Sequence, residues 1–182
     1  MPLDALEWEA LAGQVYTRQI PKKGYFTQIG EIEREIGLVL RGSFRQYYIK
    51  EGDEKTTYFF FEQMFITAYL SGLTGQKSEL AIQALEDSEV LCFTYAHWNQ
   101  LSQQFMNYQK IARSLAEYAV MGLEVRLVEL LTLSPEERYL RLLASNKKRI
   151  LERIPQHYIA SYLGVSAVSL SRIRQRIMQS PD

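Results

Sequence analysis

Three arginines close to the end of the chain, Arg172, Arg174 and Arg176, alternate with other residues in the segment SRIRQR. On a helix this spacing spreads the guanidinium groups over a wide arc, from which they can reach base edges and flanking phosphates. Ser166 is a natural N-cap for such a helix, which the segment AVSLSRIRQRIM would form. The chemistry predicted for this stretch is therefore hydrogen bonding to double-stranded DNA.

The residues before this helix complete a helix-turn-helix. Pro155 suits the first position of a helix that continues to Leu163 with apolar residues at helical spacing. Gly164 ends that helix, because a residue just past a helix end often needs a positive φ angle, which glycine adopts easily. Ala160 is small, so that the two helices can approach each other. An ordinary helical hairpin with a solvated basic face would give a similar pattern.

The spacing also predicts which side of the second helix faces outward. Leu170 and Ile173 fall on the inward side, together with Val165 of the turn. The outward positions are Ala167, Val168, Ser171 and Arg172. These are the residues that such a helix would present to a major groove.

The charge of the chain is divided unevenly. Residues 135–182 hold nine Lys and Arg against four Asp and Glu, a net charge of +5. Because the whole chain has a net charge of zero, residues 1–134 carry −5. This asymmetry indicates a basic part that meets phosphate and an acidic part with another task.

The sequence provides few residues for catalysis or metal binding. Its one cysteine, Cys92, excludes an internal disulfide, and the segment EVLCFTY around it indicates a buried apolar position. Its two histidines, His97 and His157, are too few and too far apart for the ligand cluster of a cupin-like enzyme. No GxSxG, P-loop or HExxH motif is present. We therefore expect neither an enzyme nor a bound cofactor or metal.

The N-terminus begins MPLDALEWEALAG and is acidic where a signal peptide would be basic. No apolar run reaches the roughly 18 residues that a membrane span requires. The protein is therefore expected to be cytoplasmic and to have no membrane partner. Residues 3–13 predict a short helix that ends at Gly13, with Trp8 as a packing anchor.

Residues 15–93 have the composition of β-structure. Stretches rich in aromatic and β-branched residues, such as IGLVLRGSFRQYYI and KTTYFFFEQMFI, are separated by turns that contain glycine. Strands about ten residues apart predict an antiparallel sandwich or barrel. Glu31, Glu33 and Glu35 alternate within this region. Such an acidic cluster could be catalytic, but a solvated loop or edge strand is the preferred interpretation.

A long helix is predicted from residue 105 to residue 133, because apolar residues form two neighbouring stripes at spacings of three and four. Two stripes need two partners, which we take to be the β-domain and the same helix of a second subunit. A wholly intramolecular core helix is the alternative. Ser134, Pro135 and Glu137 then predict a new capped helix. The expected domains are therefore 1–104, 105–133 and 134–182.

In this order of elements the chain resembles the Crp/Fnr superfamily of bacterial transcription regulators over residues 15–177. The similarity is carried by GLVLRGS at 37–43, ALEDSEV at 84–90, ERY at 137–139 and IASYLGVSAVSLSRIR at 159–174. The resemblance implies an α+β fold: an N-terminal antiparallel β-roll, jelly-roll-like and of the cyclic-nucleotide-binding type, a long dimerisation helix, and a winged-helix-like helix-turn-helix with a truncated wing. It also implies a homodimer that binds a pseudo-palindromic DNA site, with RNA polymerase and an unknown small-molecule effector as further candidate partners.

The resemblance does not extend to the ligand pocket. Aligned on residues 84–90, Thr67-Ala68 stands where members that bind cyclic AMP have Gly-Glu, and Ser78-Glu79 stands where they have Arg-Ser or Arg-Thr. A carboxylate beside the position of the missing arginine would repel a cyclic phosphate. We therefore expect a degenerate effector pocket that does not bind cyclic AMP tightly.

The helix-turn-helix also departs from the family. Ala167-Val168 replaces an Arg-Glu pair, whereas Arg172 matches a base-reading position. Small apolar side chains can touch a thymine methyl group but cannot form a bidentate hydrogen bond, so the DNA site should differ. By correspondence with the family, the expected phosphate contacts are Gln156, His157, Ser166 and Ser169, and Arg174 and Arg176 complete the predicted DNA-binding set. The alternative function is a sensor or interaction module on the same fold that no longer binds DNA.

Overall fold

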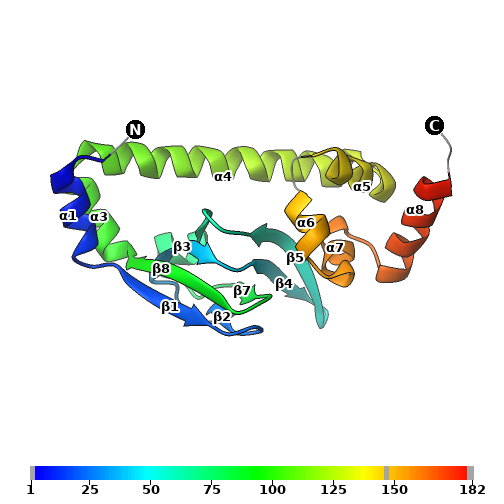
Figure 1. The fold of residues 1–182 in the computed structure, drawn as a ribbon, viewed down its shortest axis with the longest axis horizontal. Helices are drawn as coiled ribbons and strands as arrows, with labels where there is room; N and C mark the ends of the chain where they lie inside the picture. The colour runs from blue at the N-terminus through cyan, green and yellow to red at the C-terminus, as the bar shows by residue number, and fades with distance from the viewer. Residues whose placement is uncertain (1–2, 146–147, 180–182) are drawn as a thin grey trace. The chain divides into compact units, whose positions relative to one another are not determined.

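An antiparallel β-roll forms the N-terminal part of the protein, in a computed structural model that describes residues 3–145 and 148–179 (Figure 1). Its strands are β1 (Tyr16–Ile20), β2 (Tyr25–Thr27), β3 (Glu35–Arg41), β4 (Phe44–Lys50), β5 (Asp53–Phe60), β6 (Phe65–Ile66), β7 (Leu80–Ala84) and β8 (Ser88–Thr94). They form two four-stranded sheets, in the orders β1-β8-β3-β6 and β2-β7-β4-β5. The predicted strand-rich region and the α+β class are confirmed.

Strand β8 lies between β1 and β3 in the first sheet. It pairs antiparallel with both, so that Cys92 lies opposite Tyr16 on one side and Gly37 on the other. Cys92 is fully buried, as predicted, and burial raises the pKa of its thiol to about 12. Position 37 requires glycine, because a Cβ there would lie 2.5 Å from Val90 Cγ1 and 2.8 Å from Ile66 Cγ2.

The helices of the described residues are α1 (Ala5–Ala12), α2 (Tyr69–Thr74), α3 (Tyr95–Gln104), α4 (Met106–Thr132), α5 (Pro135–Ala144), α6 (Lys148–Arg153), α7 (Gln156–Leu163) and α8 (Ala167–Gln179). No strand follows α8 within the described part of the chain, which ends at residue 179. Helix α5 begins as predicted: the Glu137 N–H donates to Ser134 Oγ at 3.3 Å, and the Ser134 N–H donates to Glu137 Oε2 at 2.7 Å.

Helix α1 ends at Gly13 as predicted, but the prediction for Trp8 is wrong. Trp8 is 57% exposed, and the buried residue of α1 is its neighbour Glu7. The physical reason is hydrogen bonding: Glu7 Oε2 accepts from the Asp4 N–H at 2.9 Å and from Asn107 Nδ2 at 3.0 Å. These bonds join the first turn of α1 to the start of α4.

The chain divides into two compact units, which we call the roll unit and the C-terminal unit. The roll unit comprises Met1–Tyr47 and Phe59–Ala119, and the C-terminal unit comprises Tyr48–Tyr58 and Val120–Asp182. The tip of the β4–β5 hairpin thus belongs with the C-terminal helices. The predicted domain limits at residues 104 and 133 remain a prediction.

Helix α4 has an exposed apolar surface along its second half. The apolar residues there that are at least 44% exposed are Tyr118, Val120, Met121, Leu123, Val125, Leu127, Val128, Leu130 and Leu131. Only Tyr108, near the start of this 27-residue helix, is buried. The second half of α4 therefore leaves most of its large apolar side chains exposed.

Candidate nucleic-acid interface

A tight turn joins α7 to α8. Gly164 ends α7 with φ 75° and ψ 29°, the left-handed conformation expected from the sequence. The Ser169 N–H donates to Ser166 Oγ at 3.1 Å, so Ser166 caps α8 as predicted. Helix α7 begins at Gln156, one residue later than predicted, with Pro155 at its N-cap.

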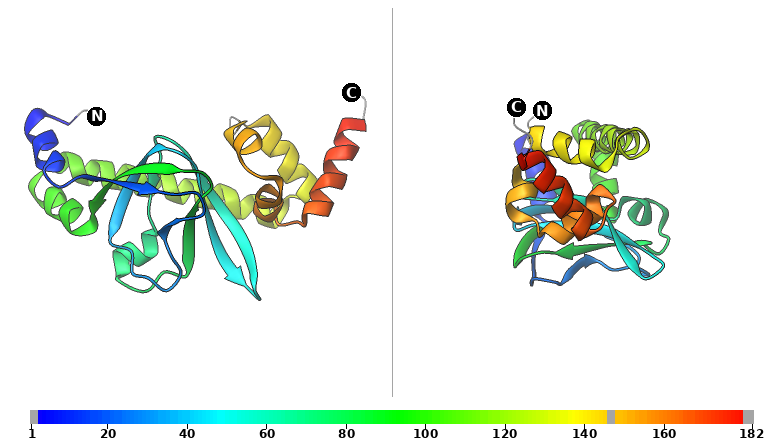
Figure 2. Two further views of the ribbon diagram at one scale, coloured as in Figure 1. Left: turned by 60° about the horizontal axis from the view of Figure 1, so that its bottom comes forward. Right: turned by 90° about the vertical axis from the view of Figure 1, so that its right-hand side faces the viewer.

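Aliphatic side chains hold the two helices together. The inner side chains, each at most 5% exposed, are Ile159, Ala160, Leu163, Leu170 and Ile173. Burial of one large aliphatic side chain contributes about 1.5–3 kcal/mol. This packing fixes α8 on α7, and the two helices follow one another in orange and red in Figure 2.

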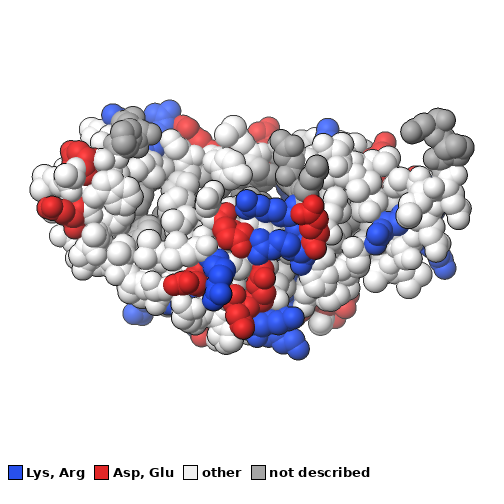
Figure 3. Space-filling view, viewed as in Figure 1, with Lys and Arg blue, Asp and Glu red and all other residues white. Residues whose placement is uncertain are grey.

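The outward side of α8 is small, apolar and basic, as the spacing predicts. Ala167, Ser171 and Arg172 are exposed, and Val168 is 61% exposed. Figure 3 shows Lys or Arg side chains on α8, at the right-hand end of the molecule. An exposed valine next to an arginine suits contact with a thymine methyl group beside a hydrogen-bonded base.

The predicted phosphate contacts lie around this surface, and two of the arginines already have protein partners. The exposed members of the predicted set are Gln156, His157, Ser166, Ala167, Val168, Ser171, Arg172, Arg174 and Arg176, and Ser169 is half-buried. Arg174 Nη1 donates to Gln156 Oε1 at 2.9 Å, which brings these two together. Arg176 Nη2 forms an ion pair with Glu136 Oε2 of α5 at 2.5 Å. A phosphate would therefore compete with Glu136 for Arg176.

The residues of the predicted effector pocket mostly serve the fold of the roll. Thr67 Oγ1 donates to a backbone carbonyl at 2.9 Å, and Ala68 is buried. Ser78 is buried and its Oγ also donates to a backbone carbonyl, whereas Glu79 is exposed. None of the four lines the cavity at the start of β3.

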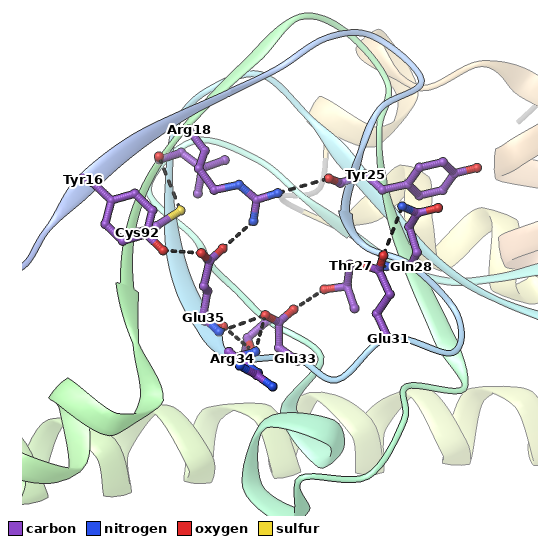
Figure 4. A network of polar contacts seen from close by, with 12 residues as sticks. Tyr16, Arg18, Tyr25, Thr27, Gln28, Glu31, Glu33, Arg34, Glu35 and Cys92 are labelled. Atoms are coloured by element: carbon purple, nitrogen blue, oxygen red, sulfur yellow. Dashed lines mark hydrogen bonds and ion pairs between the residues drawn. The ribbon is translucent and has the colours of Figure 1, made fainter.

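A cavity of about 220 Å³ lies at the start of β3. It is lined by Arg18, Phe26, Thr27, Glu31, Ile32, Glu33, Arg34 and Glu35. Figure 4 shows the polar network beside it: Arg18 forms an ion pair with Glu35, which also accepts a hydrogen bond from the Tyr16 hydroxyl. Two of the charges that line this cavity, those of Arg18 and Glu35, are thus paired with each other.

The expectation that the alternating glutamates are solvated is wrong for Glu33. Glu31 is exposed, but Glu33 is only 7% exposed. Its carboxylate accepts hydrogen bonds from the Thr27 hydroxyl and, at 2.9 Å, from the N–H groups of Arg34 and Glu35. Burial raises the pKa of the Glu33 carboxyl, although these hydrogen bonds oppose the shift. Glu33 therefore has a structural role, in which protein donors replace water.

Metal coordination has no support in the described ranges 3–145 and 148–179, where no three His, Cys, Asp or Glu residues gather into a possible metal site. His97 is buried at the start of α3, and His157 is exposed on α7. No helix in the same ranges is long and apolar enough to cross a membrane.

No sequence pattern predicts two contacts of α7 within the C-terminal unit. Ser161 Oγ accepts from the Thr56 N–H at 3.0 Å and donates to the Glu54 carbonyl at 2.9 Å, so the β4–β5 hairpin is joined to α7. Arg126 of α4 stacks on Tyr162, with Cζ 3.9 Å from the ring centroid. The only sequence signal for the second contact is an arginine within an apolar helix.

Known structures share this arrangement of elements, whereas no protein-family model and no curated protein matches the sequence. FixK2 from Bradyrhizobium japonicum matches with a TM-score of 0.78 and 15% identity, over 90% of this chain and 84% of that one. A transcriptional regulator of the Crp/Fnr family from Eubacterium rectale matches with a TM-score of 0.75 and 15% identity, over 97% and 84%. The c-di-GMP responsive global regulator CLP of Xanthomonas campestris matches with a TM-score of 0.71 and 16% identity, over 96% and 92%.

The last two of these proteins are named as regulators. Their coverage extends from the roll through α4 to the helix-turn-helix, because each match includes almost the whole chain. The protein therefore has the fold of the Crp/Fnr-type transcription regulators.

Proposed function

We propose that the protein is a sequence-specific, double-stranded DNA-binding transcription regulator of the Crp/Fnr type. The observation that carries this proposal is the outward face of α8, where Ala167, Val168, Ser171 and Arg172 are exposed on a helix capped by Ser166 and packed firmly on α7. A rigid helix with small and basic side chains on its outer side can enter a major groove.

Base recognition is assigned to three residues of this face. The Arg172 guanidinium donates to O6 and N7 of a guanine, which is the commonest specific contact in the major groove. Val168 and Ala167 touch thymine methyl groups. The preferred half-site therefore contains a G·C pair next to A·T pairs.

Phosphate contacts set the position of α8 on the duplex. Gln156 and Arg174 supply one such contact, because their hydrogen bond holds both side chains on the same edge of the helix-turn-helix. His157, Ser166 and Ser169 lie beside the N-termini of α7 and α8, where backbone N–H groups also favour an anion. Arg176 contributes once it leaves Glu136.

The active form is a homodimer. The exposed apolar residues of α4, from Tyr118 to Leu131, lie together on one continuous helix. Apolar residues that are scattered singly over a surface are normal, whereas a contiguous patch marks an interaction site. A second copy of α4 covers it in a parallel pair, in the manner of a coiled coil. The two copies of α8 then reach half-sites about one helical turn apart, which makes the DNA site pseudo-palindromic.

Regulation involves a small-molecule effector other than cyclic AMP, with RNA polymerase as a candidate partner of the DNA-bound dimer. The predicted effector pocket has no arginine that could bind a cyclic phosphate, because its residues are Thr67, Ala68, Ser78 and Glu79. An interaction module that no longer binds DNA remains the competing function, and one experiment separates the two.

The test is selection of bound sequences from a random duplex library by the purified full chain at two salt concentrations. Enrichment of a palindrome supports the proposal. Weak binding without enrichment, lost as salt rises, would favour the interaction module.

Arg172→Ala then tests the assignment of base recognition. We expect it to weaken binding to the selected site by about 1–3 kcal/mol and to relax specificity at one base pair. Arg113→Ala is the matched control, because Arg113 is an exposed arginine of α4 whose side chain pairs with Glu117 on the same helix. Equal losses on selected and random DNA for Arg172→Ala would show that Arg172 contacts phosphate.

A further inference from the structure

A small cavity lies where α4, α5 and α7 meet within the C-terminal unit. Its volume is about 30 Å³, and its walls are formed by Arg126, Glu129, Arg138, Arg141, Leu142, Ser145, Tyr162 and Leu163. A water molecule needs about 10–15 Å³ of such space. The cavity therefore has room for one or two waters or for a single small ion.

The walls of this cavity carry more positive than negative charge. The lining holds three guanidinium groups, from Arg126, Arg138 and Arg141, and one carboxylate, that of Glu129. The Glu129 oxygens lie 3.8 Å from Arg126 Nη1 and 3.6 Å from Arg141 Nη1. One carboxylate offsets one of the three charges, so the lining has a net charge of +2.

Arg126 is held in place by aromatic and backbone contacts. Its guanidinium stacks on the Tyr162 ring, and its Nη2 donates to the Tyr162 carbonyl oxygen. Only 15% of the Arg126 side chain is exposed. Burial lowers the pKa of Arg126, and the like charge of Arg138 lowers it further, whereas Tyr162 and Glu129 oppose this shift. The positive charge of Arg126 is thus held at a position where it is poorly hydrated.

Two hydrogen-bond donors of this cavity lack an acceptor among the described residues. They are the Nε–H groups of Arg126 and Arg138, and both nitrogens are buried. Arg138 Nη1 is already occupied, because it donates to the carbonyl oxygens of Leu130 at 3.3 Å and Leu133 at 2.8 Å near the end of α4. Buried donors are rarely left unpaired, since the lost hydration is not replaced.

We propose that this cavity binds a small inorganic anion about the size of chloride. The Nε–H groups of Arg126 and Arg138 donate to the anion, and the half-exposed Arg141 beside them supplies the third positive charge. The volume excludes nucleotides and other large organic anions. The bound anion joins α4 to α5 and α7, and so stabilises the attachment of the helix-turn-helix to the long helix. Its binding is independent of DNA.

The test is thermal unfolding of the full chain without DNA, followed by circular dichroism at 222 nm, as chloride replaces gluconate at constant ionic strength. Gluconate is too large for the cavity, and constant ionic strength keeps the screening of charges unchanged. We expect a stabilisation that grows with the logarithm of the chloride concentration above its Kd, with the ratio of folded to unfolded protein rising about 100-fold when chloride reaches 100 times its Kd. No response of the wild-type protein would overturn the proposal.

Variants locate the site. Arg138→Gln and Arg141→Gln each remove one positive charge from the cavity, and both should weaken the chloride response. Arg141→Gln is the safer substitution, because 57% of that side chain is exposed. Arg113→Gln removes the same charge from an exposed site on α4 and should leave the response intact. An equal response in all three variants would overturn the proposal.

A second readout does not depend on stability. In the 15N-labelled protein, the Nε–H signals of Arg126 and Arg138 should shift with chloride concentration and give the same Kd as the unfolding experiment. Chloride-dependent shifts confined to other arginines would place the anion elsewhere and refute the assignment.

Discussion

Gly164→Ala tests whether the turn between α7 and α8 depends on the left-handed conformation of residue 164 alone. The φ angle of Gly164 is 75°, and an added Cβ would meet only Arg138 Nη2, at 3.7 Å, which is ordinary van der Waals contact. Steric overlap therefore contributes nothing, and the whole effect comes from the backbone.

The magnitude follows from two opposing contributions. An L-residue other than glycine in the left-handed region costs about 1–2 kcal/mol. Alanine also restricts the unfolded chain, which returns about 0.4–1 kcal/mol. The net loss of unfolding free energy should be roughly 1 kcal/mol. Gly164→Asn should cost less, because asparagine tolerates this conformation.

Gly13→Ala is the matched control. Gly13 also follows the end of a helix, but its φ and ψ are −65° and −15°, and an added Cβ would lie 3.9 Å from the nearest atom, the Glu9 carbonyl oxygen. Only the effect on the unfolded chain remains, so this variant should be equally stable or more stable.

Urea unfolding followed at 222 nm measures both variants. The folded Gly164→Ala protein should keep its affinity for the selected DNA within about twofold, because nothing displaces α8. Two results would refute the reasoning: a Gly164→Ala protein as stable as the wild type, or a larger loss for Gly13→Ala.

Three further predictions concern contacts found in the structure. Ser161→Ala removes both hydrogen bonds to the hairpin and should destabilise the protein by about 1 kcal/mol, with faster hydrogen exchange at the Thr56 amide; Ser171→Ala, on the exposed side of α8, should change neither quantity. For Glu33 the pKa is raised in the folded state, so protonation of its carboxyl favours folding. The resulting contribution to stability is fully present below the unfolded pKa of about 4.3 and is lost as pH rises through the folded pKa. Glu33→Gln should therefore gain stability relative to the wild type as pH rises above the unfolded pKa, and a difference that does not change with pH would contradict this cause. Cys92, with its pKa raised to about 12 by burial, should resist alkylation by iodoacetamide at pH 8 until urea unfolds the protein, and rapid labelling of the folded protein would show that the roll opens.

Local patterns made the helix-turn-helix predictable. Gly164 must adopt a conformation that few other residues tolerate, Ser166 has a free helix end to cap, and Leu170 and Ile173 repeat at helical spacing. Each of these requirements is satisfied within about four residues of chain, so the sequence carries it directly. The glycine turns and alternating apolar residues of the roll are local in the same sense.

Contacts between distant residues were not predictable in this way. The sequence predicts a solvated Glu33, because acidic residues are usually exposed. In the structure its carboxylate is buried, because the Thr27 hydroxyl and two backbone N–H groups donate hydrogen bonds to it. The sequence predicts that Trp8 packs against the rest of the protein, because tryptophan is usually buried. In the structure α1 is attached instead by the hydrogen bond from Asn107 Nδ2 to Glu7, which lies on another side of the helix. In both cases a hydrogen bond from another segment decides which residue is covered.

Helix α4 shows the same limit on a larger scale. The apolar stripes are visible in the sequence, and they predict apolar sides that need partners. The sequence did not predict that charged side chains would be covered: in the last two turns the Arg126 and Glu129 side chains are 15% and 13% exposed, whereas Leu127 is 57% and Leu131 is 76% exposed. The charged side of the helix packs on α5 and α7 within its own chain, because Tyr162 and Arg141 provide partners there. The apolar side is therefore the one left exposed, and it is the surface that the proposed homodimer would use.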